Sequence, residues 1–170
     1  MSTFLIKQRN RLFELRMPRS LKIVYVWGKG LGVFANRSFK KGDKIISLKG
    51  EIVDAEGSTP EAVQIDERLF IDSRYLRPED FINHSCSPNA RLDLTVRWFF
   101  ALKNISKNEE ITFNYHTTEW DMEKYDAGFS CNCGSKNCLR AIRGFRYLTR
   151  AQKLKLRPYL SPFLTRKLSR

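Results

Sequence analysis

FINHSCSPN, residues 81–89, contains one of only four cysteines in the chain, and the interpretation of the whole sequence depends on it. The other three cysteines lie close together in SCNCGSKNC, residues 130–138. Cys86 stands beside Asn83 and His84, far along the chain from that group of three. If the four cysteines share one site, the fold must bring the two segments together.

Cys131, Cys133 and Cys138 have the spacing C-x-C-x4-C around a Gly-Ser turn. Three thiols this close cannot all pair as disulfides, and the composition is not that of a secreted disulfide scaffold. A tetrahedral zinc site needs four ligands, so three thiolates leave one position open. The candidates for that position are Cys86, His84 and His116. The other interpretation is that all four cysteines are ordinary thiols.

The composition predicts a globular protein of one domain. The chain has 170 residues, of which 42% are hydrophobic and 12% aromatic. No apolar stretch approaches the about 20 residues that a membrane span needs. The N-terminal sequence also lacks the apolar block of a secretory signal. We therefore expect a cytoplasmic, nuclear or nucleoid-associated protein.

The net charge of +13 is concentrated at the two ends of the chain. Residues 1–22 carry six Lys and Arg against one acid, and residues 139–170 carry ten against none. The intervening stretch, 23–138, is almost neutral at −2. Basic ends are typical of contact with a polyanion such as nucleic acid. A solvated surface is the alternative, because no base-reading motif accompanies the charge.

Short runs of β-branched and aromatic residues, separated by turn residues, predict a mostly β fold. The predicted strands are 21–27, 31–39, 43–54, 68–73, 95–105 and 110–115. No long amphipathic helix interrupts them, which argues against a parallel α/β sheet. Short helices are expected at the C-terminal end. One starts after Thr149 and ends near Pro158, and another starts at Ser161-Pro162.

In order and spacing, the motifs resemble those of SET-domain protein-lysine methyltransferases that have a post-SET zinc segment. The matching stretches are GKGLGVFA (28–35), LKGEIV (48–53), FINHSCSPN (81–89), EEITFNY (109–115) and FSCNCGSKNC (129–138). The resemblance covers roughly residues 20–145. It implies a β-clip SET fold of small sheets with a threaded, pseudoknot-like loop. The G-x-G segment alone would be weak evidence, because paired glycines more often mark a tight turn.

The resemblance also implies the site residues. The cofactor S-adenosylmethionine would be bound by Lys29, Gly30, Leu31, Gly32, Asn83, His84 and Tyr115. Zinc would be bound by Cys86, Cys131, Cys133 and Cys138. Tyr115 ends the ITFNY motif and corresponds to the catalytic tyrosine of the family. Without that motif, a core tyrosine would be the better interpretation.

Two further positions are expected to line a channel for the substrate lysine. Phe113 stands where family members carry Phe or Tyr, and Phe leaves room for di- or trimethylation. Leu48 replaces a tyrosine that is common in the family, so one channel wall is expected to be apolar. The stretch YLRPED, ending in Asp80, also departs from the family pattern before FINHSC. Both departures leave the substrate open.

The chemistry gives an independent reason for such a site. Methyl transfer to an amine is an in-line displacement, and alignment of the reactants can contribute about 7–11 kcal/mol. The amine must be neutral, and deprotonating a lysine of pKa about 10.4 at pH 7 costs about 4.6 kcal/mol. A desolvating aromatic channel lowers that cost. Oxygen atoms around the methyl group then stabilise the developing charge.

The expected organisation has four parts. They are a basic N-terminal extension (1–19), a SET domain (20–116), a post-SET zinc segment (117–145) and a basic helical tail (146–170). The expected function is S-adenosylmethionine-dependent methylation of a lysine in a histone-like or other nucleic-acid-associated protein. The alternative is a non-catalytic SET-like zinc scaffold that binds nucleic acid or chromatin through its ends. A Rossmann-type methylase fits poorly, because GKGLG lacks the strand–GxGxxG–helix context.

Overall fold

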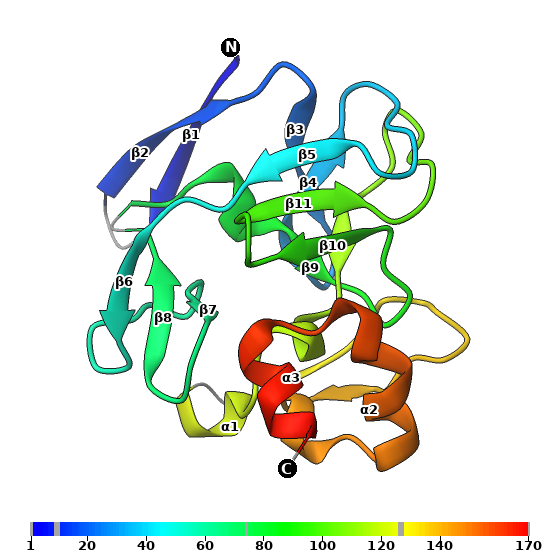
Figure 1. The fold of residues 1–170 in the computed structure, drawn as a ribbon. Coiled ribbons are helices and arrows are strands. Elements are labelled where there is room, and N and C mark those ends of the chain that lie inside the picture. Colours follow the sequence, from blue (N-terminus) through cyan, green and yellow to red (C-terminus); the bar gives the residue numbers. More distant parts are fainter. Residues whose placement is uncertain (1, 9–10, 74, 126–127, 170) are drawn as a thin grey trace.

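The computed structural model describes residues 2–8, 11–73, 75–125 and 128–169. Its strands form six small sheets of two or three strands each, and its α-helices all follow residue 121 (Figure 1). The mostly β class that the sequence predicts, with short C-terminal helices, is confirmed. No helix in these ranges is long and apolar enough to cross a membrane.

Fourteen strands and seven helical segments make up the described chain. The strands are β1 (Ser2–Gln8), β2 (Arg11–Met17), β3 (Leu21–Val26), β4 (Gly30–Ala35), β5 (Lys44–Ser47), β6 (Glu51–Asp54), β7 (Val63–Gln64), β8 (Leu69–Asp72), β9 (Asn83–His84), β10 (Ala90–Asp93), β11 (Trp98–Ala101), β12 (Thr112–Phe113), β13 (Phe129–Ser130) and β14 (Ala141–Ile142). The helices are α1 (Met122–Tyr125), α2 (Arg150–Leu156) and α3 (Pro162–Leu168). The 3₁₀ turns are η1 (Pro78–Phe81), η2 (Tyr115–Thr117), η3 (Phe145–Tyr147) and η4 (Arg157–Tyr159).

Antiparallel pairing builds five of the six sheets. β1 pairs with β2, β3 with β4, and β13 with β14, while β10-β11-β5 and β6-β8-β7 form three-stranded sheets. β9 and β12 instead run parallel, with Asn83 opposite Thr112 and His84 opposite Phe113. The two motifs that are most specific in the sequence therefore lie side by side.

Asn89 fastens the end of the first motif to the start of the second. Its side-chain amide donates to the Glu110 carbonyl at 2.7 Å, and its oxygen accepts from the Thr112 N–H at 2.9 Å. Asn89 is buried, so these bonds satisfy polar groups that would otherwise be costly to bury. Asn89 therefore links the segment after β9 to the backbone at the start of β12.

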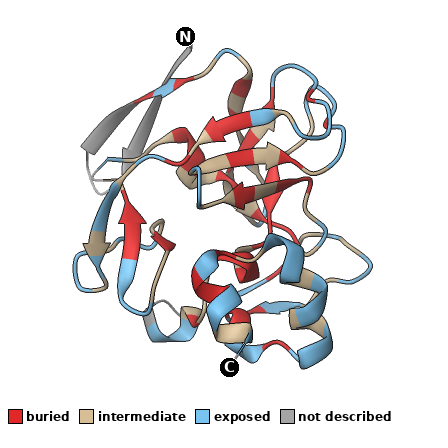
Figure 2. Ribbon diagram, in the orientation of Figure 1, coloured by how far each residue is buried: buried red, intermediate tan, exposed pale blue. Residues whose placement is uncertain are grey.

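The buried residues, red in Figure 2, include two hydrophobic clusters. The main cluster fills the space among the strands and includes Val33, Phe99 and Ile111. The second cluster contains Phe145, Leu148, Phe163 and Leu164 and is made by the C-terminal segments. The helices therefore have a small core of their own.

Both helix starts that the sequence predicts are confirmed. The Thr149 hydroxyl accepts from the Gln152 N–H, and the Gln152 side chain accepts from the Thr149 N–H, which is a reciprocal cap for α2. The Ser161 hydroxyl accepts from the Leu164 N–H at 3.2 Å, and Pro162 follows as the first residue of α3.

The predicted strand 43–54 is wrong as a single element. It breaks into β5, which pairs with β11, and β6, which pairs with β8. The break lies at Gly50, which has a φ of +151° and packs so tightly that an added Cβ would lie 2.5 Å from the Asp72 carbonyl oxygen. Only glycine fits this corner comfortably. Leu48 is buried at the same corner.

The N-terminal residues form a hairpin, which the sequence did not predict. β1 and β2 pair over their full length. Leu15 and Met17 are buried in the main cluster, so the end of this hairpin packs with the core. Two residues within the predicted N-terminal extension 1–19 therefore contribute to the main core.

Candidate active site

Tyr115 is held at both ends by residues of the neighbouring motif. Its backbone N–H donates to His84 Nδ1 at 3.1 Å, and its phenol donates to the Ile82 carbonyl at 3.0 Å. Its ring also packs against His84, with 5.2 Å between centroids, and against Phe113, with 4.8 Å. The phenol is therefore fixed in position by hydrogen bonding and by ring packing.

Burial keeps the Tyr115 phenol protonated. The desolvated site raises its pKa well above the usual range, and the charges of Glu119 and Glu110 act in the same direction. At neutral pH the group can therefore orient a reactant by hydrogen bonding, but it does not act as a base.

His84 links Tyr115 to Cys86. Burial is the main reason that its pKa is lowered to about 3, so the ring is neutral. Since Nδ1 accepts from Tyr115, the proton is on Nε2, which lies 3.3 Å from the Cys86 sulfur and donates to it. Both ring nitrogens are therefore occupied by internal partners.

Two cavities lie on either side of Tyr115, and Tyr115 lines both. The first, of about 480 Å³, is called here the hairpin cavity. Its wall comes from the β3–β4 hairpin, from β9 and Tyr115, and from the segment that bears the cysteines. Its lining residues are Tyr25, Gly28, Lys29, Gly30, Asn83, His84, Tyr115, Phe129, Ser130, Cys131, Asn132 and Cys133.

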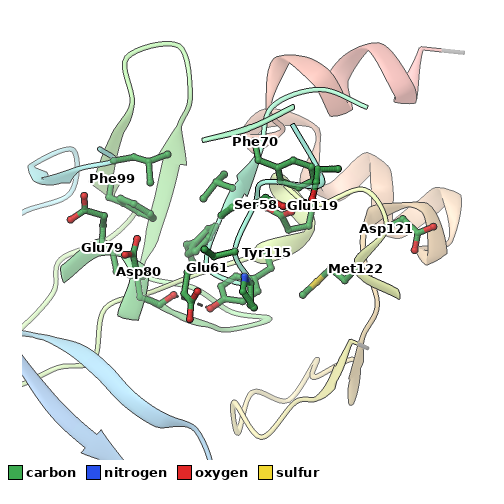
Figure 3. Close-up of a pocket in the computed structure, with 18 residues that line it drawn as sticks. Ser58, Glu61, Phe70, Glu79, Asp80, Phe99, Tyr115, Glu119, Asp121 and Met122 are labelled. Carbon is green, nitrogen blue, oxygen red and sulfur yellow. Dashed lines mark hydrogen bonds between the residues drawn. The ribbon is translucent and has the colours of Figure 1, made fainter. Parts of the chain in front are cut away.

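The second cavity, of about 350 Å³, is called here the acidic cavity. Figure 3 shows Tyr115 on its wall, with Glu79 and Asp80 on one side and Glu119 and Phe70 on the other. Five of its lining residues carry carboxyl groups and none is Lys or Arg. They are Glu61, Glu79, Asp80, Glu119 and Asp121.

Aromatic and aliphatic side chains line the acidic cavity near Tyr115. Phe113, Phe99 and Leu48 are all buried there, with 5.2 Å between the two phenyl centroids. Phe113 and Leu48, the two residues expected in a lysine channel, thus lie in one wall. This part of the cavity offers a desolvating surface beside a fixed phenol.

A polar network supports the hairpin cavity. The Asn83 amide donates to the Leu31 carbonyl at 3.1 Å and to a Glu110 carboxylate oxygen at 2.9 Å, and Lys29 pairs with the other oxygen at 2.7 Å. Gly32 lies beneath it, and an added Cβ would come 2.9 Å from the Asn83 amide and 3.0 Å from Glu110. The second glycine of G-x-G therefore leaves room for this network.

Glu110 is a functional candidate that the sequence prediction missed. It joins Lys29 to Asn83, two residues that were predicted for the cofactor site. Its position directly before ITFNY was visible in the sequence. A charged residue there is common on any strand edge, however, so the signal was weak.

The four cysteine sulfurs lie within 4.8 Å of one another, as the prediction of one shared site requires. Backbone N–H groups add support: Leu139 donates to the Cys86 sulfur and Arg140 to the Cys138 sulfur, each at 3.4 Å. Tetrahedral Zn–S bonds of about 2.3 Å place sulfurs roughly 3.8 Å apart. The donor set and its spacing therefore fit zinc. No histidine joins this group among the described residues.

Ionisation of all four thiols would require a cation. Burial is the main cause that raises the pKa of Cys86 to about 11, and the neighbouring thiols add to it. A compact group of four thiols cannot ionise together without a positive charge among them. A divalent metal would supply that charge and would join residues 129–138 to the loop at Cys86.

Two half-buried carboxyls in the acidic cavity have strongly perturbed acidity. Burial raises the pKa of both Glu119 and Asp80 to about 7. Glu119 accepts from the Gln64 N–H at 3.2 Å, whereas Asp80 accepts from the Ser73 hydroxyl at 3.0 Å and the Arg77 N–H at 2.8 Å. The sequence prediction did not include Glu119, because nothing in its local pattern indicates burial.

Comparison with known proteins identifies the family of the chain. The family model described as "SET domain" matches residues 30–116. A relative from Debaryomyces hansenii, "Histone-lysine N-methyltransferase, H3 lysine-36 specific", is 27% identical over 156 residues, which is 80% of this chain and 21% of that protein. The "Variant-silencing SET domain-containing protein" of Plasmodium falciparum is 30% identical over 157 residues, covering 76% of this chain and 6% of that one. The chain thus spans about a fifth or less of the length of these relatives.

Solved structures show the same fold. KRYPTONITE in complex with mCHG DNA and SAH gives a TM-score of 0.60 at 25% identity, over 76% of this chain and 30% of that one. KRYPTONITE with mCHH DNA, an H3(1-15) peptide and SAH gives 0.58 at 24% identity, with the same coverages. Since the family model matches half of the sequence and the fold agrees, the chain belongs to the SET domain family.

Proposed function

We propose that the chain transfers a methyl group from S-adenosylmethionine to a lysine side chain of a protein. One observation carries the proposal: Tyr115 lines both cavities, so a donor in one and an acceptor in the other would meet at its phenol. Relatives named as histone-lysine N-methyltransferases and SET structures that contain SAH support the reaction class.

The hairpin cavity is proposed as the donor site. Gly30 and Lys29 line it and leave backbone close to any bound molecule, while Asn83 and His84 form the opposite wall. Leu31 and Gly32 would act indirectly, through Asn83. The Leu31 carbonyl accepts a hydrogen bond from the Asn83 amide, and the absence of a side chain at Gly32 leaves room for that amide. When bound, S-adenosylmethionine supplies a methyl group on a sulfonium.

The acidic cavity is proposed as the acceptor site. Phe113 and Leu48 would remove water from the amine, which favours its neutral form. The Tyr115 phenol donates its proton to the Ile82 carbonyl, so its lone pairs remain available to orient the reacting groups. The absence of a hydroxyl on Phe113 leaves room for more than one methyl group.

Zinc is proposed as a structural cofactor held by Cys86, Cys131, Cys133 and Cys138. Its role would be to keep residues 129–133 on the wall of the hairpin cavity, which those residues line. This role supports the proposed organisation: an N-terminal extension to residue 19, a SET domain 20–116, a post-SET segment 117–145 and a helical tail 146–170.

The substrate is proposed to be a histone-like or other nucleic-acid-associated protein, acted on in a nucleus or nucleoid. The names of the relatives and the presence of an H3 peptide in one SET structure support this choice. The basic ends would favour the same setting by contact with a polyanion.

The test is labelling of a proteome extract with methyl-labelled S-adenosylmethionine, comparing the wild type with Tyr115→Phe. We expect labelling to fall by about 100-fold or more, because one oriented oxygen is removed from the reaction centre. Thermal denaturation should show a folded variant. Unchanged labelling would contradict the assignment of Tyr115. A metal-loaded wild type that does not bind SAH in calorimetry would instead indicate a non-catalytic scaffold.

A further inference from the structure

The acidic cavity is a negative site in a strongly positive molecule. The chain has 31 Lys and Arg against 18 Asp and Glu, yet five acids and no Lys or Arg line this cavity. A site of this sign attracts cations, and low-dielectric walls strengthen the attraction. The question is which of these carboxyls is available to a ligand.

Three of these acids, buried or half-buried, already have structural partners. Asp121 pairs with Arg146 at 2.6 Å. Glu79 accepts from the Lys49 N–H at 3.1 Å, and Asp80 accepts the two hydrogen bonds described above. Their partners lie in the loops that they stabilise, so the sequence uses these acids to hold the cavity wall.

Glu119 differs from these acids. Its carboxyl accepts from the Gln64 N–H, a neutral donor, whereas the nearby Thr118 hydroxyl donates to the Tyr115 carbonyl. Within the described part of the chain it forms no ion pair, although it is close enough to Tyr115 to affect the acidity of the phenol. A desolvated carboxylate that faces a cavity without a cation is destabilised until a cation enters.

On the basis of the proposed function, we propose that Glu119 is a specificity-determining residue that binds a positively charged side chain of the acceptor polypeptide. The acceptor would then be a lysine with another Lys or Arg nearby in the same segment. The near-neutral pKa of this carboxyl fits the role, since an arriving cation would favour its ionised form.

A purely structural role for Glu119 is the competing explanation. The carboxyl joins the segment after Tyr115 to β7 through Gln64, whose own side chain accepts from the Trp120 N–H at 2.8 Å. Two substitutions separate the roles. Glu119→Gln keeps an oxygen for the Gln64 N–H and removes only the charge, whereas Glu119→Ala removes both.

The experiment measures binding of two fluorescent peptides by anisotropy, without methyl transfer. Both carry one lysine, flanked by arginines in one peptide and by citrullines, their neutral isosteres, in the other. We expect the wild type to bind the arginine peptide about tenfold more tightly, a difference of about 1.4 kcal/mol. Glu119→Gln should reduce this ratio to about twofold. The matched control is Glu56→Gln, which removes one carboxylate from the exposed pair with Arg68, and it should leave the ratio unchanged.

A ratio that persists in Glu119→Gln, or no preference in the wild type, overturns the inference. Kinetics with the arginine peptide add a second readout. Glu119→Gln should raise KM several-fold with kcat within about twofold, whereas a structural role would leave this variant like the wild type and impair only Glu119→Ala. If the wild type shows the binding preference but transfers no methyl group, the proposed function fails while cation binding by Glu119 stands.

Discussion

The hairpin cavity and the acidic cavity share Tyr115 but differ in the parts of the chain that line them. The hairpin cavity uses glycine backbone from the β3–β4 turn and is closed by residues 129–133, next to the cysteine cluster. The acidic cavity uses side chains from the strands and from the segments at 55–63 and 79–82. One cavity therefore depends on joining two distant segments, whereas the other depends mainly on the packed core.

Removal of the proposed zinc should give the largest difference between the two cavities. Chelation, or Cys86→Ser, should release the proposed link between the core and residues 129–133. We expect SAH affinity to fall by about tenfold or more, with a smaller loss of peptide binding, because the main hydrophobic cluster contains none of these ligands. Calorimetry and metal analysis check this, with the exposed Ser87→Ala as control. Equal losses of SAH affinity and of peptide affinity would contradict the conclusion that the two cavities are built independently.

Gly32→Ala should affect the hairpin cavity alone and more moderately. The new Cβ would press on the Asn83 amide and on Glu110, separating groups that now hydrogen bond. We expect SAH affinity to fall about fivefold and stability to fall by about 1–3 kcal/mol. Gly57→Ala is the control, because its Cβ meets only ordinary contacts. If Gly32→Ala binds SAH with normal affinity, the hydrogen-bond network of Lys29, Glu110 and Asn83 is not needed for donor binding.

Glu119→Gln should affect the acidic cavity in a way that depends on pH. The folded-state pKa of about 7 lies above the usual 4.5, so the stability contributed by the protonated carboxyl is lost as pH rises through that interval. The variant should therefore gain stability relative to the wild type between pH 5 and pH 8, by up to about 3 kcal/mol. Asp80 titrates in the same range in both proteins, so only the difference between them is informative. If the difference in stability between Glu119→Gln and the wild type does not change with pH, the Glu119 carboxyl is not desolvated as described.

Arg166→Ala should give the smallest effect. Arg166 of α3 pairs at 2.7 Å with Asp66, in the turn between β7 and β8, and both side chains are about half exposed. We expect a loss below about 1 kcal/mol that disappears at high salt, since α3 is held mainly by Phe163 and Leu164. Urea denaturation at two salt concentrations checks it. A larger loss of stability would mean that the ion pair with Asp66, rather than the hydrophobic contacts of α3, holds the helix in place.

The sequence predicted best what is encoded locally. The caps at Thr149 and Ser161 depend on a few neighbouring residues, and the motifs around Asn83 and Tyr115 include most of the contacts that place them. The break at Gly50 and the position of the half-buried Glu119 depend instead on distant backbone, at Asp72 and Gln64 respectively. No local pattern contains that information.

The prediction for Asn83 shows the same limit at a single residue. Asn83 was expected to bind the cofactor, and in the structure both hydrogen bonds of its side-chain nitrogen are internal, to Leu31 and Glu110. Its side chain still lines the hairpin cavity, so its role toward the cofactor remains a proposal. Residue type and motif predicted the location, but only the fold shows which atoms are free.

The position of residues 129–133 along the chain has a consequence for biosynthesis. The strands that bury the main hydrophobic cluster leave the ribosome before this wall is made, and domains generally fold as their segments emerge. A nascent chain would thus contain every residue that lines the acidic cavity before it contains the last residues of the hairpin cavity. The proposed zinc could be bound by all four cysteines only after Cys138 has been synthesised, so the hairpin cavity would be completed late in translation.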